Sequence, residues 1–410
     1  MSHNASDEAL PEETPPANLL TQPREGLPDL IETSHQLDLA ISQLVAGSGP
    51  IAIDAERASG YRYSQRAYLV QVRREGSGTF LIDPTAFDSL TPIFEPLREE
   101  EWILHAATQD LACLREVGIN PQSLFDTEYA GRLLGKPKVG LSSLLQSEMD
   151  ISLAKEHSAA DWSTRPIPEP WLNYAALDVE LLIELREILR TQLEERDRWS
   201  WAQQEFEYLV GWKPAAPPEE AWRKLSGIHT VRDPRQLAIA RELWKWRDEH
   251  AQVRDKAVGR VMPDAAIVDV AKLPLKSARD VFMLSSLRNR SHKSSADAMW
   301  EIRQRALALP DHQLPVAVKK SGAIPPPKAW AERNPDAAAR WEKVRPALSA
   351  IATELEIAPE VLVSPEPIRQ FCWNPEEALQ SETSLTEWLR DRNVRQWQIE
   401  FISPILSATD

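Results

Sequence analysis

The chain has 410 residues, of which 42% are hydrophobic and 27% charged, and its net charge is −15. This length corresponds to two or three domains of ~100–200 residues each, and the composition is that of a globular protein. No run approaches the ~18 apolar residues of a membrane span. The two cysteines, Cys113 and Cys372, form no paired motif, which excludes a disulfide framework and a thiolate zinc site. The N-terminus lacks the basic head and apolar core of a secretory signal, so we expect a cytoplasmic protein.

The net charge is distributed unevenly, with acidic ends and a basic middle segment. Residues 1–50 and residues 351–410 each carry a net charge of −7, whereas residues 230–320 hold eighteen Lys or Arg and eleven Asp or Glu, a net charge of +7. Phosphates are attracted to clustered positive charge. The interval 230–320 is therefore the part of the chain that we expect to meet a nucleic acid.

The first half of the chain predicts an α/β fold. Residues 1–30 are rich in Pro and Glu without periodicity, which predicts a disordered acidic tail. Three β-rich runs follow at 50–56, 67–74 and 79–84, and the short polar gaps between them are typical of an antiparallel meander. Expected helices, ending at 101 and covering 110–117, 127–134, 141–149 and 170–198, then alternate with expected strands at 102–107 and 124–125. Strands first and alternation afterwards indicate a mixed sheet flanked by helices.

The second half of the chain is predicted to be helical. A Pro-rich stretch at 211–222 reads as a linker, beyond which the strand signal disappears and helical spacing dominates 233–310. A second Pro-rich break, SGAIPPPKAW, precedes another helical region that runs to the C-terminus. We expect a tail at 1–30, an α/β domain at 31–205, a linker at 206–229, and helical domains at 230–315 and 316–410.

Two acids close the first β-rich run. Asp54 and Glu56 are two residues apart, so on a strand they share a face. Neighbouring carboxylates repel unless a cation lies between them, and Mg²⁺ or Mn²⁺ prefers such ligands. The alternative is a strand that simply ends at the surface. Asp126 and Glu128 repeat the spacing, but there Asp126 or Thr127 resembles a helix N-cap and Glu128 a first-turn acid, so we interpret this pair as structural.

Two further motifs carry acids in helical settings. Asp110 stands in the first turn of an expected helix, where the helix dipole alone explains an acid. Tyr174 and Asp178 are four residues apart and share a helix face beside apolar positions. The alternative for this pair is a Tyr–Asp hydrogen bond at the edge of the core.

Together and in order, these motifs resemble the DEDD exonuclease superfamily, and specifically the ribonuclease D group, whose third motif is Tyr-x-x-x-Asp. DAE stands at 54–56, LHAATQDL at 104–111 and YAALD at 174–178. The intervening YSQRAYLVQV, LIDP, LFDTEYAGRLLG and DWSTRP agree as well, while Ala55 departs from the usual Thr. The resemblance covers about residues 48–200 and implies a ribonuclease H-like exonuclease domain.

The resemblance also implies the roles of the site residues. It makes four acids the ligands of two divalent metal ions, Mg²⁺ or Mn²⁺: Asp54, Glu56, Asp110 and Asp178. Two such ions activate a water and stabilise the attacking and leaving oxygens at phosphorus. Tyr174 is expected to orient the water or the scissile phosphate, and His105 is interpreted as a core histidine. Three cations are expected to approach the nucleic acid, with solvated surface charges as the alternative: Arg57, Lys155 and Arg165.

The helical half resembles the HRDC domain, a small nucleic-acid-binding module found in helicases and ribonuclease D. The resemblance rests on LWKWRDEHA, VMPDAAIVDVAKLP and SLRNRSHKSSADAMWEI. A basic cluster in front of its last helix, Arg288, Arg290 and Lys293, is expected to contact RNA phosphates. A solvated charge run is the alternative. Residues 328–410 look like a second, divergent HRDC-like domain.

The resemblance implies a metal-dependent 3′–5′ exoribonuclease that releases 5′-monophosphates from RNA with a 3′ end, tRNA precursors above all. We expect all-α HRDC-type domains behind the exonuclease domain, no membrane association, no obligate protein partner and a monomer. A 3′–5′ DNA exonuclease shares the metal chemistry and differs only in contacts to the 2′-hydroxyl. A non-catalytic RNA-binding scaffold is the second alternative, although the four acids are all present.

Overall fold

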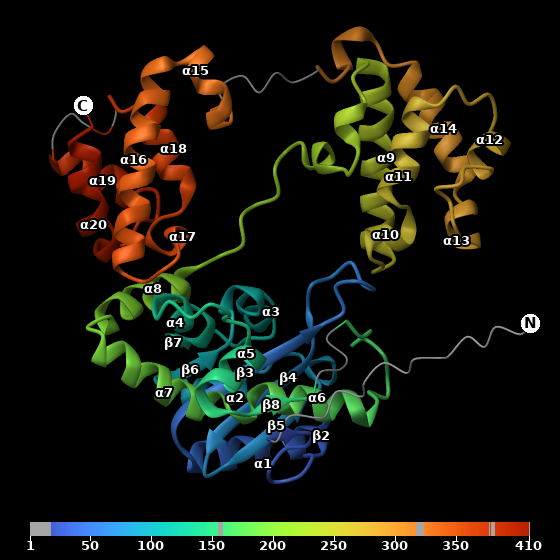
Figure 1. Cartoon of the computed structure of the whole chain (residues 1–410). Coiled ribbons are helices and arrows are strands. Elements are labelled where there is room, and N and C mark those ends of the chain that lie inside the picture. The colour runs from blue at the N-terminus through green and yellow to red at the C-terminus, as the bar shows by residue number, and fades with distance from the viewer. Residues whose placement is uncertain (1–17, 155–158, 317–323, 377, 379–381, 410) are drawn as a thin grey trace, which may run out of the picture.

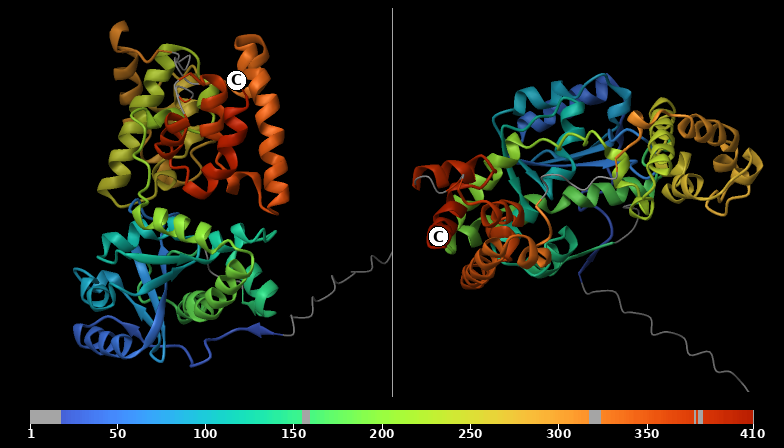
Figure 2. Two further views of the ribbon diagram at one scale, coloured as in Figure 1. Left: turned by 90° about the vertical axis from the view of Figure 1, so that its left-hand side faces the viewer. Right: turned by 90° about the horizontal axis from the view of Figure 1, so that it is seen from above.

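The computed structural model describes residues 18–154, 159–316, 324–376, 378 and 382–409. It contains an α/β domain, which runs from β1 to α8, and two helical domains on one side of it (Figures 1 and 2). The first helical domain comprises α9 to α14 and the second comprises α15 to α20. Within the described ranges, no helix combines the length and the apolar character needed to cross a membrane.

The α/β domain is built on a six-stranded mixed sheet of order β2-β5-β4-β3-β6-β7. Neighbouring strands are antiparallel from β3 to β5, as the expected meander requires, and β6 and β7 continue parallel to β3. The strands are β2 (Leu30–Ile31), β3 (Ser48–Arg57), β4 (Ala67–Glu75), β5 (Gly78–Ile82), β6 (Glu101–Leu104) and β7 (Ser123–Asp126). The predicted mixed sheet flanked by helices is confirmed.

The alternation of side chains along β3 separates the core from the site. Ile51, Ile53 and Ala55 are buried in the main core, whereas Asp54 and Glu56 lie on the opposite face, toward α6. The helices of this domain are α1 (Ser34–Ala46), α2 (Thr91–Phe94), α3 (Leu111–Glu116), α4 (Thr127–Leu133), α5 (Leu141–Met149), α6 (Glu169–Glu180), α7 (Leu182–Glu195) and α8 (Trp199–Gly211).

Two expected helices are shorter in the structure. The helix expected at 170–198 breaks at Leu181, so that α6 packs against β3, β4 and β5 while α7 packs against β3 and β6. Two short helices follow the twist of the sheet better than one straight helix. The helix expected to end at 101 is reduced to single turns, because Pro92 and Pro96 lack the N–H that a continuous helix needs.

Residues 18–30, which we expected in the disordered tail, lie against the α/β domain. Strand β1 (Leu19–Leu20) pairs with β8 (Ser152–Leu153), and the Arg24 guanidinium lies 2.6 Å from the Glu184 carboxylate. The apolar pair at the end of an otherwise acidic segment supplies the strand. The rest of the expected tail, residues 1–17, lies outside the described residues.

The second helical domain shares a continuous core with the α/β domain. Trp397 stacks on Trp201 of α8 with ring centroids 4.8 Å apart, and its indole N–H donates to Glu205 at 2.8 Å. Arg395 pairs with the same carboxylate, which is buried. The helices are α15 (Trp330–Arg333), α16 (Pro335–Glu354), α17 (Pro359–Leu362), α18 (Pro365–Trp373), α19 (Glu382–Arg390) and α20 (Gln396–Ser407).

The first helical domain has a core of its own. Its helices are α9 (Pro234–Val253), α10 (Val258–Val261), α11 (Asp264–Lys272), α12 (Ala278–Phe282), α13 (Arg290–Lys293) and α14 (Ala296–Leu307). Trp222 and Leu225, expected in the linker, are already buried with this domain, and α8 extends to Gly211. The linker between the α/β domain and the first helical domain is therefore reduced to residues 212–220, which form no helix (Figure 1).

Trp397→Ala is expected to lower the free energy of unfolding by about 3–5 kcal/mol, because it removes a fully buried indole and its stacking on Trp201. Trp397→Phe keeps a ring but loses the hydrogen bond to Glu205, and we expect a smaller loss of about 1–3 kcal/mol. Urea denaturation followed by circular dichroism measures both. Equal losses for the two variants would show that ring packing contributes nothing.

Candidate active site

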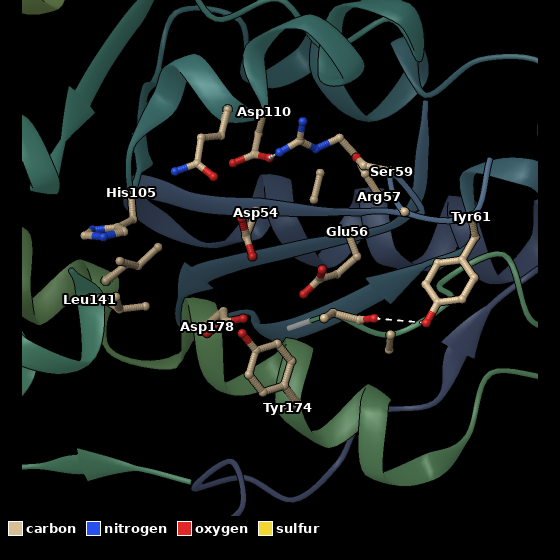
Figure 3. Close-up of a pocket in the computed structure, with 16 residues that line it drawn as sticks. Asp54, Glu56, Arg57, Ser59, Tyr61, His105, Asp110, Leu141, Tyr174 and Asp178 are labelled. Atoms are coloured by element: carbon tan, nitrogen blue, oxygen red, sulfur yellow. Dashed lines mark hydrogen bonds and ion pairs between the residues drawn. The ribbon is translucent and has the colours of Figure 1, made fainter. Parts of the chain in front are cut away.

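A cavity of about 420 Å³ lies where β3 ends, between the sheet and α6 (Figure 3). Its walls include all five residues of the three sequence motifs: Asp54, Glu56, Asp110, Tyr174 and Asp178. These side chains come from β3, from the turn in front of α3 and from α6. Three segments that are far apart in the sequence therefore meet at one hollow.

Three carboxylates converge at the centre of the cavity. Asp54, Glu56 and Asp178 each offer one oxygen, and these oxygens lie within 4.8 Å of one another. Figure 3 shows the three side chains pointing toward a common point from the strand and from α6. A hard divalent cation takes oxygen ligands at such spacing. The donor set and its geometry therefore fit a metal ion.

Asp110 belongs to the same cavity but lies outside this group of three. Its carboxylate is 3.6 Å from the Arg57 guanidinium, and it is within hydrogen-bonding reach of Asp54. Asp110 is 6% exposed, whereas the Arg57 side chain is 26% exposed, so the acid is buried while the cation reaches the solvent. Without a bound cation, Arg57 provides the positive charge nearest to this acid.

The turn in front of Asp110 is held by the other acid pair of the sequence. Asp126 accepts hydrogen bonds from the N–H groups of Ala106 and Ala107, and from two N–H groups at the start of α4. Ala106 has a left-handed backbone (φ 57°), a strained conformation that these bonds stabilise. Glu128 pairs with Arg132 at 2.6 Å. The interpretation of this pair as structural is confirmed, and Asp126 also positions the turn that carries Asp110.

Burial and mutual repulsion raise the pKa values of the acids. Burial, followed by the charges of Asp54, Asp178 and Asp110, raises the pKa of Glu56 to about 10. The pKa values of Asp54, Asp110 and Asp178 are also raised, with burial as the largest cause. Without a cation, Glu56 retains its proton at neutral pH. A divalent ion would replace that proton and stabilise the ionised carboxylates.

Tyr174 is a hydrogen-bond donor at neutral pH. Burial, together with the nearby charge of Asp178, raises the pKa of its phenol well above its usual value of ~10. The phenol forms a side-chain hydrogen bond with Asp178, one turn along α6. A phenol that holds its proton this firmly can orient an oxygen but cannot act as a general base.

His105 is a residue whose position the sequence did not reveal. We interpreted it as a core histidine, yet it lines the cavity and its Nδ1 lies 2.9 Å from the Thr127 hydroxyl. Burial lowers its pKa to about 4, so the ring is neutral. Gln109, Ser59 and Tyr61 were missed as well, although each lies within five residues of a motif acid.

The cations that we expected near the nucleic acid have different environments. Arg57 lines the cavity. Arg165 does not offer its guanidinium to a ligand, because it donates to both Asp83 oxygens and to the carbonyls of Tyr68, Trp162 and Thr164. In the structure Arg165 holds the loop before α6 to the sheet, and its expected contact with the nucleic acid stays a prediction. Lys155 lies outside the described residues.

The basic cluster of the first helical domain is apart from the cavity. Arg288 and Arg290 are exposed in front of α14, and Lys293 lies 5.0 Å from the ring centroid of Phe282. None of the three lines the cavity. Their contact with RNA stays a prediction.

Comparison with known proteins agrees with this geometry. Residues 28–194 match the family model described as 3′-5′ exonuclease. Ribonuclease D of Pseudomonas paraeruginosa is 31% identical over 280 residues, which cover 67% of this chain and 73% of the relative. The chain belongs to the ribonuclease D family. Ribonuclease D of a Jannaschia species is 30% identical over 299 residues, which cover 70% of this chain and 77% of that protein. Membership makes the chain a 3′–5′ exoribonuclease by class.

The helical regions of this ribonuclease D family member match models too. Residues 236–302 match the HRDC domain, and residues 323–409 match a model described as 3′ to 5′ exonuclease C-terminal domain. A crystal structure of a protein from Bifidobacterium adolescentis is similar with a TM-score of 0.86 and 36% identity, covering 96% of this chain and 99% of that one. Escherichia coli RNase D shares the fold, with a TM-score of 0.67 and 23% identity over 93% of this chain and 98% of that one.

Glu56→Gln is expected to stabilise the metal-free protein as the pH rises. The folded state holds the Glu56 proton more tightly than the unfolded state, so this group's contribution to stability is fully present below about pH 4.5 and is lost toward pH 10. The glutamine variant has no such proton to lose. Calorimetry in EDTA should show the Tm of the wild type falling relative to Glu56→Gln between pH 5 and pH 8.

Glu128→Gln is the matched control, because Asp126 and Glu128 have the same Asp-x-Glu spacing as Asp54 and Glu56 and Glu128 lies outside the cavity. We expect its Tm to follow the wild type at each pH. Added Mg²⁺ should raise the Tm of the wild type and of Glu128→Gln, but not that of Glu56→Gln. Identical pH profiles for all three proteins would contradict the assignment of the buried charge to Glu56.

Proposed function

We propose that this ribonuclease D family member removes nucleotides one at a time from RNA 3′ ends by metal-dependent hydrolysis, releasing 5′-monophosphates. The observation that supports this most directly is the meeting of Asp54, Glu56 and Asp178 within 4.8 Å, with Asp110 in the same cavity. The raised pKa of Glu56 marks a site in which the one nearby cation, Arg57, does not balance the charge of four acids. A phosphodiester adds further negative charge, so its binding here requires cations.

The four acids fit two divalent ions, Mg²⁺ or Mn²⁺. When bound, such ions supply an activated water and stabilise the charges of an in-line displacement at phosphorus. Asp54, Glu56 and Asp178 would each supply a ligand oxygen to the ions. Asp110 faces the same space from the other side, beside Arg57. The chain itself thus provides the ligands and one fixed cation.

The protein's own side chains orient the substrate. The Tyr174 phenol keeps its proton and donates toward an oxygen of the scissile phosphate or of the attacking water. His105, neutral and hydrogen-bonded to Thr127, offers its remaining ring nitrogen at the wall of the cavity. A cavity of 420 Å³ is of the size that encloses one small ligand. This size favours a single terminal nucleotide over the middle of a strand.

RNA is the substrate that the relatives favour. The relatives are named ribonuclease D, and the Escherichia coli structure is described as an exoribonuclease involved in structured RNA processing. The basic interval 230–320, with exposed Arg288 and Arg290, supports contact with phosphates. We propose tRNA precursors as the natural partner, and we propose that the protein acts as a monomer in the cytoplasm.

Asp178→Asn is expected to lower the rate by about 10²-fold or more, because it removes one charge from the ligand set. The measurement is the shortening of a 5′-labelled RNA in Mg²⁺, with Glu128→Gln as a control that shortens the RNA like the wild type. Equal shortening by Asp178→Asn would overturn the site and revive a non-catalytic scaffold. Faster digestion of a matched DNA strand by the wild type would favour the DNA exonuclease instead.

Tyr174→Phe is expected to lower kcat by about 10-fold or more while leaving KM within about twofold, because the phenol acts on the reacting oxygens rather than on the bound strand. The phenyl ring keeps the packing on Trp162, whose ring centroid is 6.4 Å away. Steady-state kinetics on the same RNA separates the two constants. A rise in KM with an unchanged kcat would assign Tyr174 to substrate binding alone.

A further inference from the structure

The first helical domain holds one wall of the cavity. The rim segment, residues 59–68, follows β3, and its first three residues line the cavity. Asp255, in the left-handed conformation (φ 44°) after α9, accepts hydrogen bonds from the N–H groups of Tyr63 at 3.1 Å and Ser64 at 2.9 Å. The Tyr68 hydroxyl donates to the same carboxylate at 3.3 Å. One carboxylate of another domain therefore fixes the shape of the rim segment.

Arg260 contacts two cavity-lining residues directly. Its Nε donates to the Gly60 carbonyl at 2.8 Å, and its guanidinium lies 4.0 Å from the centroid of the Tyr61 ring. The N–H of Ala257 donates to the Tyr61 carbonyl at 3.0 Å, and the Tyr61 hydroxyl donates to Ala159 across the cavity at 3.3 Å. Arg260 thus stacks on a tyrosine that two hydrogen bonds hold in place, one at its carbonyl and one at its hydroxyl.

The outer part of the Arg260 guanidinium is available to a ligand. The residue is exposed, and within the described part of the chain its two terminal nitrogens have no hydrogen-bond acceptor and no acidic partner. Arg165, in contrast, has every donor engaged by the protein. A guanidinium that is oriented by stacking and keeps a free pair of donors matches the geometry of a phosphate.

The path of an RNA strand leads toward this residue. A cavity that encloses one small ligand leaves the rest of the strand to cross its rim. Figure 3 shows Leu141 and His105 at one end of the cavity and Tyr61 at the other, and the Tyr61 end is next to Arg260. Arg66, also on the rim segment, is half-buried, with its guanidinium 5.6 Å from the centroid of the Tyr68 ring. A polyanion takes the cationic exit.

We propose that Arg260 binds a backbone phosphate of the RNA strand upstream of the terminal nucleotide, with Tyr61 as the ring that orients it. The first helical domain thereby contributes a substrate-binding residue at the edge of the catalytic cavity. This inference rests on the proposed exonuclease function, and it adds a length requirement. A dinucleotide, whose single phosphate is the scissile one, has nothing to offer Arg260, whereas a longer strand does.

Arg260→Gln tests the proposal, because glutamine retains an N–H donor for the Gly60 carbonyl and removes the charged guanidinium head that stacks on Tyr61. For an unstructured 12-nucleotide RNA in Mg²⁺, we expect KM to rise about fivefold or more with kcat within about twofold. We expect the slope of log(kcat/KM) against log[salt] to fall by about one. On a dinucleotide, the variant should match the wild type.

Arg305→Gln is the matched control, because it removes one positive charge from an exposed position on α14 of the same domain. It should match the wild type on both substrates. Arg260→Lys, which keeps the charge, should restore the salt slope. A 12-nucleotide KM for Arg260→Gln equal to that of Arg305→Gln overturns the proposal, as does an equal loss on the dinucleotide, which would mean that Arg260 only packs the rim. A wild type that cuts neither RNA refutes the exonuclease function itself.

Discussion

Repulsion among buried carboxyl groups is the constraint on which the rest of this structure depends. Asp54, Glu56, Asp110 and Asp178 share one cavity, and each has its pKa raised with burial as the leading cause. Only Asp110 has a protein cation as close as 3.6 Å, in Arg57, among the described residues. Such a cluster opposes folding in the absence of metal. It persists because the surrounding elements leave the acids little freedom to move apart.

Each acid is fixed by a different part of the fold. Asp54 and Glu56 lie on β3, where they are opposite Gln71 and Leu69 of β4, so that neither can turn away without breaking the sheet register. Asp178 is carried by a helix that packs against three strands. The turn before Asp110 is tied by the Asp126 carboxylate to the start of α4. A structural acid therefore positions a functional one.

The local patterns predicted most of the α/β domain and the identity of the acids. The alternation at 51–56 assigned Asp54 and Glu56 to one face, and the helical spacing placed Tyr174 beside Asp178, as the structure shows. The sequence pattern did not predict the break at Leu181, because each half of 170–198 follows a helical pattern. It is tertiary packing on a twisted sheet that separates the two halves. The intramolecular hydrogen bonds of Arg165 could not be predicted for a related reason, since the acceptors on Tyr68 and Asp83 are distant in sequence.

The arrangement of the helical domains could not be predicted from the sequence, because it depends on contacts between segments that share no local pattern. At Gly135 a Cβ atom would overlap the Glu356 carbonyl of the second helical domain, so a glycine there permits a close approach that no composition reveals. The sequence around Asp255 likewise does not reveal that its carboxylate binds the N–H groups of Tyr63 and Ser64 and so orders the rim of the cavity. The second helical domain shares the core of the α/β domain, whereas the first reaches it largely through polar contacts to the rim segment. Polar contacts of this kind exchange with water at small net cost. The domain closest to the cavity is therefore also the one attached without a shared core, and its contacts to the rim segment, more than its own fold, determine the shape of the entrance.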